Sequence, residues 1–219
     1  MGSKDFKLDM TMMFAMHDAL RRELERMARV TARVDGDPRS VLTTAVGWEM
    51  FKTFLTVHHT AEDVMIWPVM QQALAGRPDD LELLDAMEAE HAAIDPLLTA
   101  IDAALADHES GAARLGDLSD ALVTTLTTHL KHEESDALRL IDATLSEEQW
   151  KNFSAEHRGR IGDNAPRFMP WLLDEASEEN FSLIVGRMPE NLQAAYENEW
   201  RRAYQALNLW GPGGVEAAR

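Results

Sequence analysis

The chain has 219 residues, with 38 acidic residues against 21 basic ones and a net charge of −17. This charge repels nucleic acids and anionic membrane surfaces, so neither is expected as a partner. There is no cysteine, no run of 18 apolar residues and no signal-peptide pattern, so we expect no disulfide, thiolate metal site or membrane segment, and a cytoplasmic location.

Four long helical patterns come first along the chain. Each has apolar residues at helical spacing and ends at a cluster of Gly, Pro, Asp or Ser, which is typical of turns. The predicted helices cover residues 8–34, 38–74, 80–106 and 112–145. Because their lengths are similar and their connections short, we expect an all-α fold with an up-down-up-down four-helix bundle over residues 1–145.

The pattern changes after Leu145. Ser146 followed by two glutamates is a typical helix start, and shorter helical stretches follow. We expect residues 146–219 to form a helical extension packed on the bundle. Two roles remain open for this extension. It stabilises the bundle or a homodimer, or it covers a functional site and brings His157 to it.

Each predicted bundle helix carries one histidine on its apolar face, and these are His17, His58, His91 and His129. The midpoint between each successive pair lies at or beside a predicted turn. Residues equidistant from the turn of an antiparallel hairpin lie at the same height in a bundle. The four histidines are therefore predicted to form one layer across it.

An acidic residue follows three of these histidines after one helical turn: Glu62, Asp95 and Glu133. Residues at this spacing share a helix face. Helices two and four run in the same direction, so Glu62 and Glu133 lie on one side of the histidine layer and Asp95 on the other. Buried carboxylates need a countercharge, so we predict two bridged metal ions, with Asp95 as a terminal ligand. Nitrogen and oxygen ligands without sulfur suit iron, manganese or zinc.

Over about residues 9–145 the sequence resembles the hemerythrin family with its HHE cation-binding motif. The resemblance rests on a first-helix histidine followed, in order, by HHTAEDVMIWP, EHAAID and HLKHEE. It implies a four-helix bundle with two iron ions bridged by carboxylates and an oxo or hydroxo group. The implied ligands are His17 and His58 for one iron, His91, His129 and Asp95 for the other, and Glu62 and Glu133 as bridges.

Two features depart from the oxygen-carrying members of this family. Those members have histidine at the position of Asp95, and a longer spacing to the last bridging acid than that from His129 to Glu133. Pro96 also disfavours a helical conformation at Asp95, whose alternative role is that of a solvated acid. As a ligand, Asp95 would stabilise ferric iron and favour peroxide or oxygen chemistry over reversible oxygen carriage.

For several neighbouring residues the sequence leaves two roles open. His59 is expected to be partly exposed or to lie behind the ligands, because it is turned about 100° from His58. Asp63 is expected to orient a ligand or to face solvent, and Glu134 to face solvent or a neighbouring helix. The methionines near His17 belong to the core or line a pocket for a small gas.

The resemblance leaves two kinds of function open. An iron with only two terminal histidines keeps a position for dioxygen, peroxide or nitric oxide, which favours a di-iron redox protein with catalase-like or oxygen-activating turnover. The alternative is a non-catalytic module that binds or senses oxygen or iron and signals through the extension.

Overall fold

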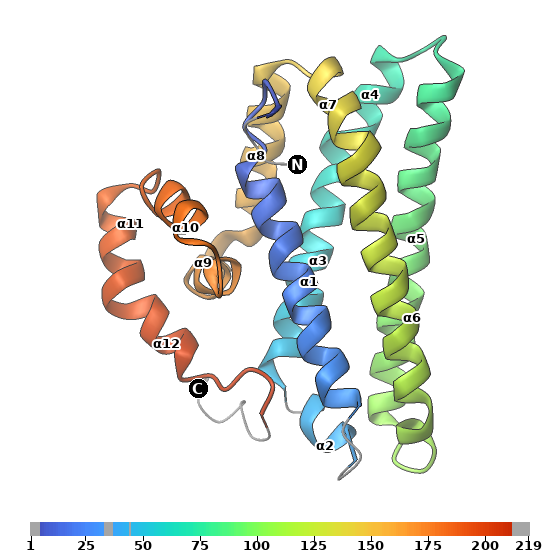
Figure 1. Cartoon of the computed structure of the whole chain (residues 1–219), viewed down its shortest axis with the longest axis vertical. Helices are drawn as coiled ribbons and strands as arrows, with labels where there is room; N and C mark the ends of the chain where they lie inside the picture. The colour runs from blue at the N-terminus through green and yellow to red at the C-terminus, as the bar shows by residue number, and fades with distance from the viewer. Residues whose placement is uncertain (1–4, 33–36, 44, 212–219) are drawn as a thin grey trace.

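The computed structural model describes residues 5–32, 37–43 and 45–211 of the chain, apart from the side chain at position 40. These residues form helices and no strands, which confirms the predicted all-α class. Four long helices form an antiparallel bundle (Figure 1): α1 (Thr11–Thr31), α3 (Val46–Met65), α5 (Pro78–Ala106) and α6 (Gly111–His132). Residues 35 and 36 of the first predicted turn, DGDP, lie outside the described residues.

The second predicted helix is interrupted twice. A short helix α2 (Arg39–Leu42) precedes α3, and α4 (Trp67–Ala73) follows it after a distortion at Ile66. Pro68 lies in the first turn of α4, where its lack of an N–H group is tolerated but prevents continuation of the α3 hydrogen bonds. The prediction of one continuous helix over 38–74 is therefore wrong, although the three shorter helices together cover most of this range.

The third and fourth helices depart from expectation in opposite ways. Helix α5 continues through Pro96, so the expected loss of helical conformation at this point is wrong. Pro96 is exposed, and solvent can bond the carbonyl group that a proline leaves unpaired. Helix α6 is instead followed by a π-helical segment, Glu133–Ala137, and then by α7 (Leu138–Thr144).

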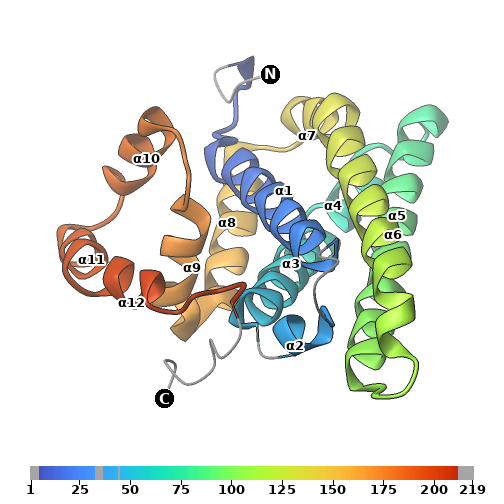
Figure 2. The same ribbon diagram turned by 60° about the horizontal axis from the view of Figure 1, so that its bottom comes forward.

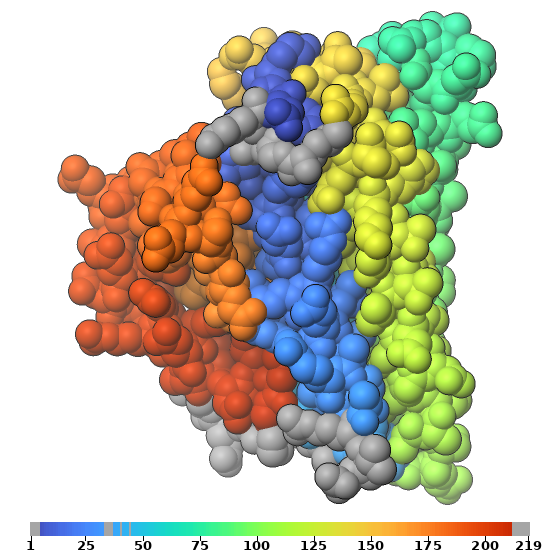
Figure 3. Space-filling model, viewed as in Figure 1, coloured from blue at the N-terminus to red at the C-terminus, as the bar shows by residue number. Residues whose placement is uncertain are grey.

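Further helices follow the bundle: α8 (Glu147–Ile161), α9 (Ala165–Leu173), α10 (Glu178–Val185), α11 (Glu190–Ala195) and α12 (Arg201–Gln205). Helix α8 starts at the predicted position, where Ser146 and Gln149 form a reciprocal capping box. It packs along α3, while α9 and α10 contact α1 (Figure 2). The segment from α9 to α12 stands as a lobe beside the bundle (Figure 3).

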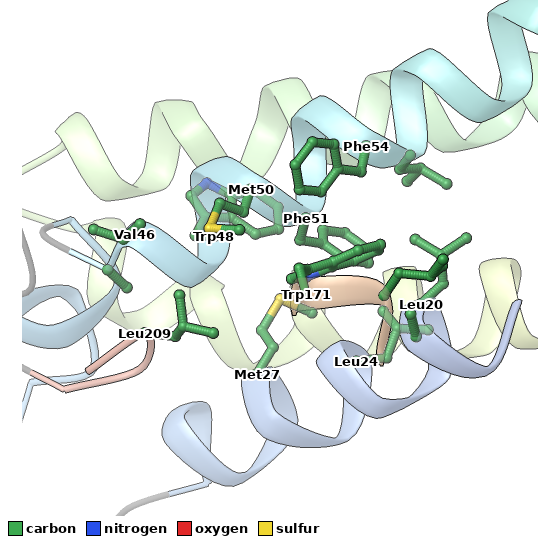
Figure 4. Close-up of a cluster of buried hydrophobic side chains, with 14 of the residues drawn as sticks. Leu20, Leu24, Met27, Val46, Trp48, Met50, Phe51, Phe54, Trp171 and Leu209 are labelled. Carbon is green, nitrogen blue, oxygen red and sulfur yellow. The ribbon is translucent and has the colours of Figure 1, made fainter. Parts of the chain in front are cut away.

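The extension contributes to the core of the bundle itself. Figure 4 shows the indole of Trp171, from α9, inserted among Leu20, Leu24 and Met27 of α1 and Phe51 and Phe54 of α3. Trp171 is fully buried, and its ring centroid lies 4.9 Å from that of Phe54. Burying an aromatic side chain of this size is worth about 2–3 kcal/mol. No helix in the described part of the chain has the length and apolar character needed to cross a membrane.

Candidate metal centre

The four predicted histidines meet in one buried layer of the bundle. His17 on α1 faces His58 on α3, with 3.2 Å between their Nε2 atoms. His91 on α5 faces His129 on α6 at the same separation. All four residues are at most 5% exposed. In each pair, the two Nε2 atoms are therefore directed toward each other inside the bundle and away from solvent.

Glu62 lies between the two histidine pairs. Its Oε1 atom is 3.3 Å from Nε2 of His58, and its Oε2 atom is 3.5 Å from Nε2 of His91. Each oxygen of the carboxylate thus faces a different pair. Glu62 would therefore be available as a ligand to a cation beside either pair.

Glu133 occupies the matching position on the other side. Its Oε2 atom is 3.2 Å from Nε2 of His17 and 3.8 Å from Nε2 of His129. Glu133 is the first residue of the π-helical segment, a local widening of the helix that occurs often at functional sites. The next residue, Glu134, also points at His17, so consecutive acids contact the two ring nitrogens of one histidine.

Neither Glu62 nor Glu133 is satisfied by the protein. Both side chains are fully buried, and none of their four carboxylate oxygens accepts a hydrogen bond. The imidazole contacts described above are close but lack hydrogen-bond geometry. An unpaired buried polar group costs roughly 1–3 kcal/mol, and more when it is charged. These oxygens are the structural evidence that the residues fit a cation, which would use all of them.

The charges of this layer are strongly coupled. Burial and the neighbouring Glu133 raise the pKa of Glu62 well above its ordinary value. Burial alone would lower the pKa of His17, but Glu133 and Glu134 outweigh it and raise that pKa to about 9. The metal-free centre therefore holds protons at neutral pH that bound cations would displace.

Three carboxylates behind the layer fix the orientation of the imidazoles. They accept from the Nδ1 atoms of three histidines: His17 to Glu134 at 2.8 Å, His91 to Asp63 at 2.7 Å, and His129 to Glu90 at 2.9 Å. An Nδ1–H group that donates outwards leaves the Nε2 lone pair directed inwards, which is the usual arrangement behind metal-bound histidines. Asp63 thus takes the orienting role that was one of its two predicted alternatives, and Glu90 was missed.

His59 joins the layer, contrary to expectation. It is 6% exposed, its ring stacks on His91 at a centroid distance of 3.9 Å, and its Nε2 atom has no hydrogen-bond partner. Nitrogen atoms of His59, His91 and His129 lie within 4.8 Å of one another. The turn of about 100° that separates His59 from His58 directs it at α5 and α6, whereas His58 is directed at α1.

Asp95 does not join the layer. It is exposed on α5, and its backbone carbonyl accepts a hydrogen bond from Thr99. The buried residues after His91 are Ile94 and Leu98, so the inward face of α5 continues three residues after the histidine rather than four. The structure therefore places Asp95 away from the buried histidines, contrary to the position predicted for a terminal ligand.

Together the layer offers two donor groups suited to cations. One contains His17, His58, Glu62 and Glu133, and the other contains His59, His91 and His129. The model of the family described as the hemerythrin HHE cation binding domain matches residues 9–141. The chain belongs to the hemerythrin HHE family. Searches of curated proteins and of solved structures gave no match.

The hemerythrin match ends before α8, yet α8 brings one more histidine to the centre. The ring centroid of His157 lies 6.0 Å from that of His58, and its buried Nε2 atom has no hydrogen-bond partner. Burial lowers the pKa of His157 to about 4, so the imidazole is neutral. His157 thus stands beside the two-histidine group, as the covering role of the extension would require.

Proposed function

We propose that this hemerythrin-family centre holds two iron ions and reacts with a small oxidant, namely dioxygen, peroxide or nitric oxide. The observation that carries the proposal is the pair of buried carboxylates, Glu62 and Glu133, whose four oxygens have no hydrogen-bond partner among surrounding imidazoles. Two iron ions bridged by these carboxylates would together supply electrons to the oxidant.

The two groups contain different numbers of histidines, and this difference favours binding of the oxidant on the side of His17 and His58. His17 and His58 serve one position, whereas three imidazoles serve the other. If Glu62 and Glu133 serve both positions, the first position has one histidine ligand fewer than the second and keeps room for an external ligand. His58 also lines a cavity, and His157 offers a neutral hydrogen-bonding nitrogen beside it. We propose that His157 orients the oxidant and that the neighbouring apolar side chains exclude water.

A sensing role is the second candidate, and one contact favours it. Arg22 on α1 donates hydrogen bonds to the backbone carbonyl groups of Trp171 and Asp174 in the lobe. Since His17 lies on the same helix, a change at the centre has a direct path to the lobe. A reversible optical change with oxygen, without consumption of peroxide, would support sensing rather than turnover.

The test combines elemental analysis with an oxygen electrode. We expect two irons per chain, and peroxide-dependent oxygen evolution or oxidant-dependent optical changes. Both properties should be lost in His58→Ala. The matched control is His108→Ala, because His108 is exposed in the turn after α5 and its loss should change neither property. Zinc or manganese in place of iron would contradict the proposed chemistry while leaving the cation site intact.

A further inference from the structure

A cavity of about 770 Å³ lies between the bundle and the extension. The residues that line it come from the N-terminal segment, α1, His58 of α3, and the chain from α8 to Trp200. Most of the lining residues follow residue 145 and therefore lie outside the part matched by the family. The cavity reaches His58, so it connects the surface with the two-histidine side of the centre.

This volume greatly exceeds the needs of a small oxidant. A water molecule occupies about 30 Å³, and dioxygen or peroxide is of similar size. Pockets of roughly 300–1,000 Å³ are typical of organic ligands. The cavity is thus large enough for an organic molecule with a body of many carbon atoms.

The walls are mainly apolar and adaptable. The lining includes Met13 and Met16 of α1, Phe153 of α8 and Phe168 of α9. Methionine side chains are flexible and fit apolar ligands of varied shape. Met12 and Leu192 extend this surface to the mouth, where they are 41% and 37% exposed although both are large and apolar. Such a lining favours an apolar ligand body.

The mouth of the cavity carries positive charge. Its charged lining residues are Lys7, Lys151, Arg158, Arg187, Asp9 and Glu147. Arg187 pairs with Asp9, and Lys151 with Glu147. Among the described residues, Lys7 and Arg158 form no ion pair, and both are exposed. Two uncompensated cations in a chain of net charge −17 attract an anionic group to this mouth.

We propose that the cavity binds an elongated amphipathic carboxylate, with its carboxylate between Lys7 and Arg158 and its apolar chain directed along Met13 and Met16 toward His58. Binding itself needs no metal. The further idea that the apolar end of the ligand meets an oxidant at the metal centre rests on the proposed function.

Dodecanoate is a suitable probe, titrated into the full-length protein after iron removal by a chelator. Trp150 and Trp200 line the cavity, so their fluorescence reports occupancy, and calorimetry gives the stoichiometry. We expect saturable binding of one dodecanoate per chain below its micelle concentration. Dodecanol, which keeps only the apolar body, should bind more weakly, and acetate, which keeps only the carboxylate, should not bind in this range.

The charge at the mouth is tested by Arg158→Glu. We expect its Kd for dodecanoate to rise about tenfold, as the loss of one favourable charge pair and the gain of a repulsive one imply, with little change for dodecanol. The matched control is Arg167→Glu, which makes the same change at an exposed residue outside the cavity and should alter the Kd less than twofold.

The shape of the cavity is tested by Ser154→Trp. Ser154 is exposed and lines the cavity, so the new indole should block entry of dodecanoate and dodecanol without disturbing the core. Binding of dodecanoate to the wild type that does not saturate would overturn the inference. So would a dodecanoate affinity equal to that of the wild type in both Arg158→Glu and Ser154→Trp. Iron content separates the two proposals. Dodecanoate binding without iron uptake contradicts only the proposed function, and two irons without dodecanoate binding contradict only this inference.

Discussion

Helix α1 borders two buried carboxylate sites that differ in how their charge is balanced. Glu23 is fully buried, but its Oε1 atom accepts from Arg22 at 2.8 Å and Arg26 at 3.0 Å, and its Oε2 atom from Trp210 at 2.7 Å. The protein thus supplies both the countercharge and the hydrogen bonds. Since Arg26 also bonds Asp174, this site ties the lobe to the bundle.

Glu62 and Glu133, in the histidine layer, are equally buried but accept no hydrogen bond. Their neighbours are imidazole Nε2 atoms, three of which belong to rings whose Nδ1 atoms face carboxylates behind the layer. Burial of a carboxylate alone therefore does not indicate function. The informative feature is a buried carboxylate whose oxygens accept no hydrogen bond from the protein, and whose charge is balanced in the metal-free chain only by protons held in the layer.

Iron addition should show the largest difference between the sites. At a free iron concentration a thousand times the Kd, binding stabilises the native state by about 4 kcal/mol. We expect this gain for the wild type in urea unfolding, and its loss in Glu62→Leu. In the metal-free form Glu62→Leu should be at least as stable as the wild type, because it removes an unsatisfied carboxylate. A metal-free Glu62→Leu protein with a much lower free energy of unfolding than the metal-free wild type would contradict the distinction between the two sites.

The opposite result is expected at the satisfied site. Glu23→Gln should lower the free energy of unfolding by about 3 kcal/mol, because Arg22 and Arg26 lose their shared buried countercharge. Iron content should stay at two per chain. The control is Glu25→Gln, a change at an exposed residue of the same helix, which should shift stability by less than about 0.5 kcal/mol. Equal losses in both variants would show that the Glu23 network does not support the fold.

The metal-free protein should lose stability as the pH rises from 7 to 9. The folded-state pKa of His17 is raised from 6.5 to about 9, so its stabilising effect is complete below 6.5 and disappears as the pH passes 9. The expected loss over this interval is about 2 kcal/mol. Bound iron should abolish it, since Nε2 of His17 would then be occupied. A metal-free stability that is constant between pH 7 and 9 would contradict the coupling of His17 with Glu133.

The smallest effect is expected at Asp95. Asp95→Ala should retain two irons and change stability by less than about 0.5 kcal/mol, because the residue is exposed. His59→Ala should instead lower iron affinity at the three-histidine side, as judged by competition with a chelator. If iron is lost from Asp95→Ala and kept by His59→Ala, the assignment of these residues must be reversed.

The spacing of buried residues explains which site residues could be predicted. On α3 the inward face runs from His58 to Glu62, four residues on, whereas on α5 it runs from His91 to Ile94, only three residues on. The acid four residues after a histidine is therefore inward in one helix and outward in the other. The alternation of three and four along α5 was visible in the sequence and could have excluded Asp95.

Other features depend on contacts that no local pattern contains. His59 faces inward because α3 borders helices on both sides of His58, and this requires the bundle geometry. In the sequence, Glu23 is not distinguished from the other polar residues of α1. Its hydrogen bond from Trp210 joins residues that are far apart in the sequence. The insertion of Trp171 into the bundle core is likewise a long-range contact. Local periodicity predicted the helices and the histidine layer, but not how the extension meets them.

Anomalous diffraction at the iron edge, from crystals of the iron-loaded protein, tests the central claim most directly. We expect two peaks on either side of Glu62 and Glu133, one beside His17 and His58 and one beside His59, His91 and His129. A single peak, a peak at Asp95, or imidazoles that surround only solvent after iron loading would contradict it.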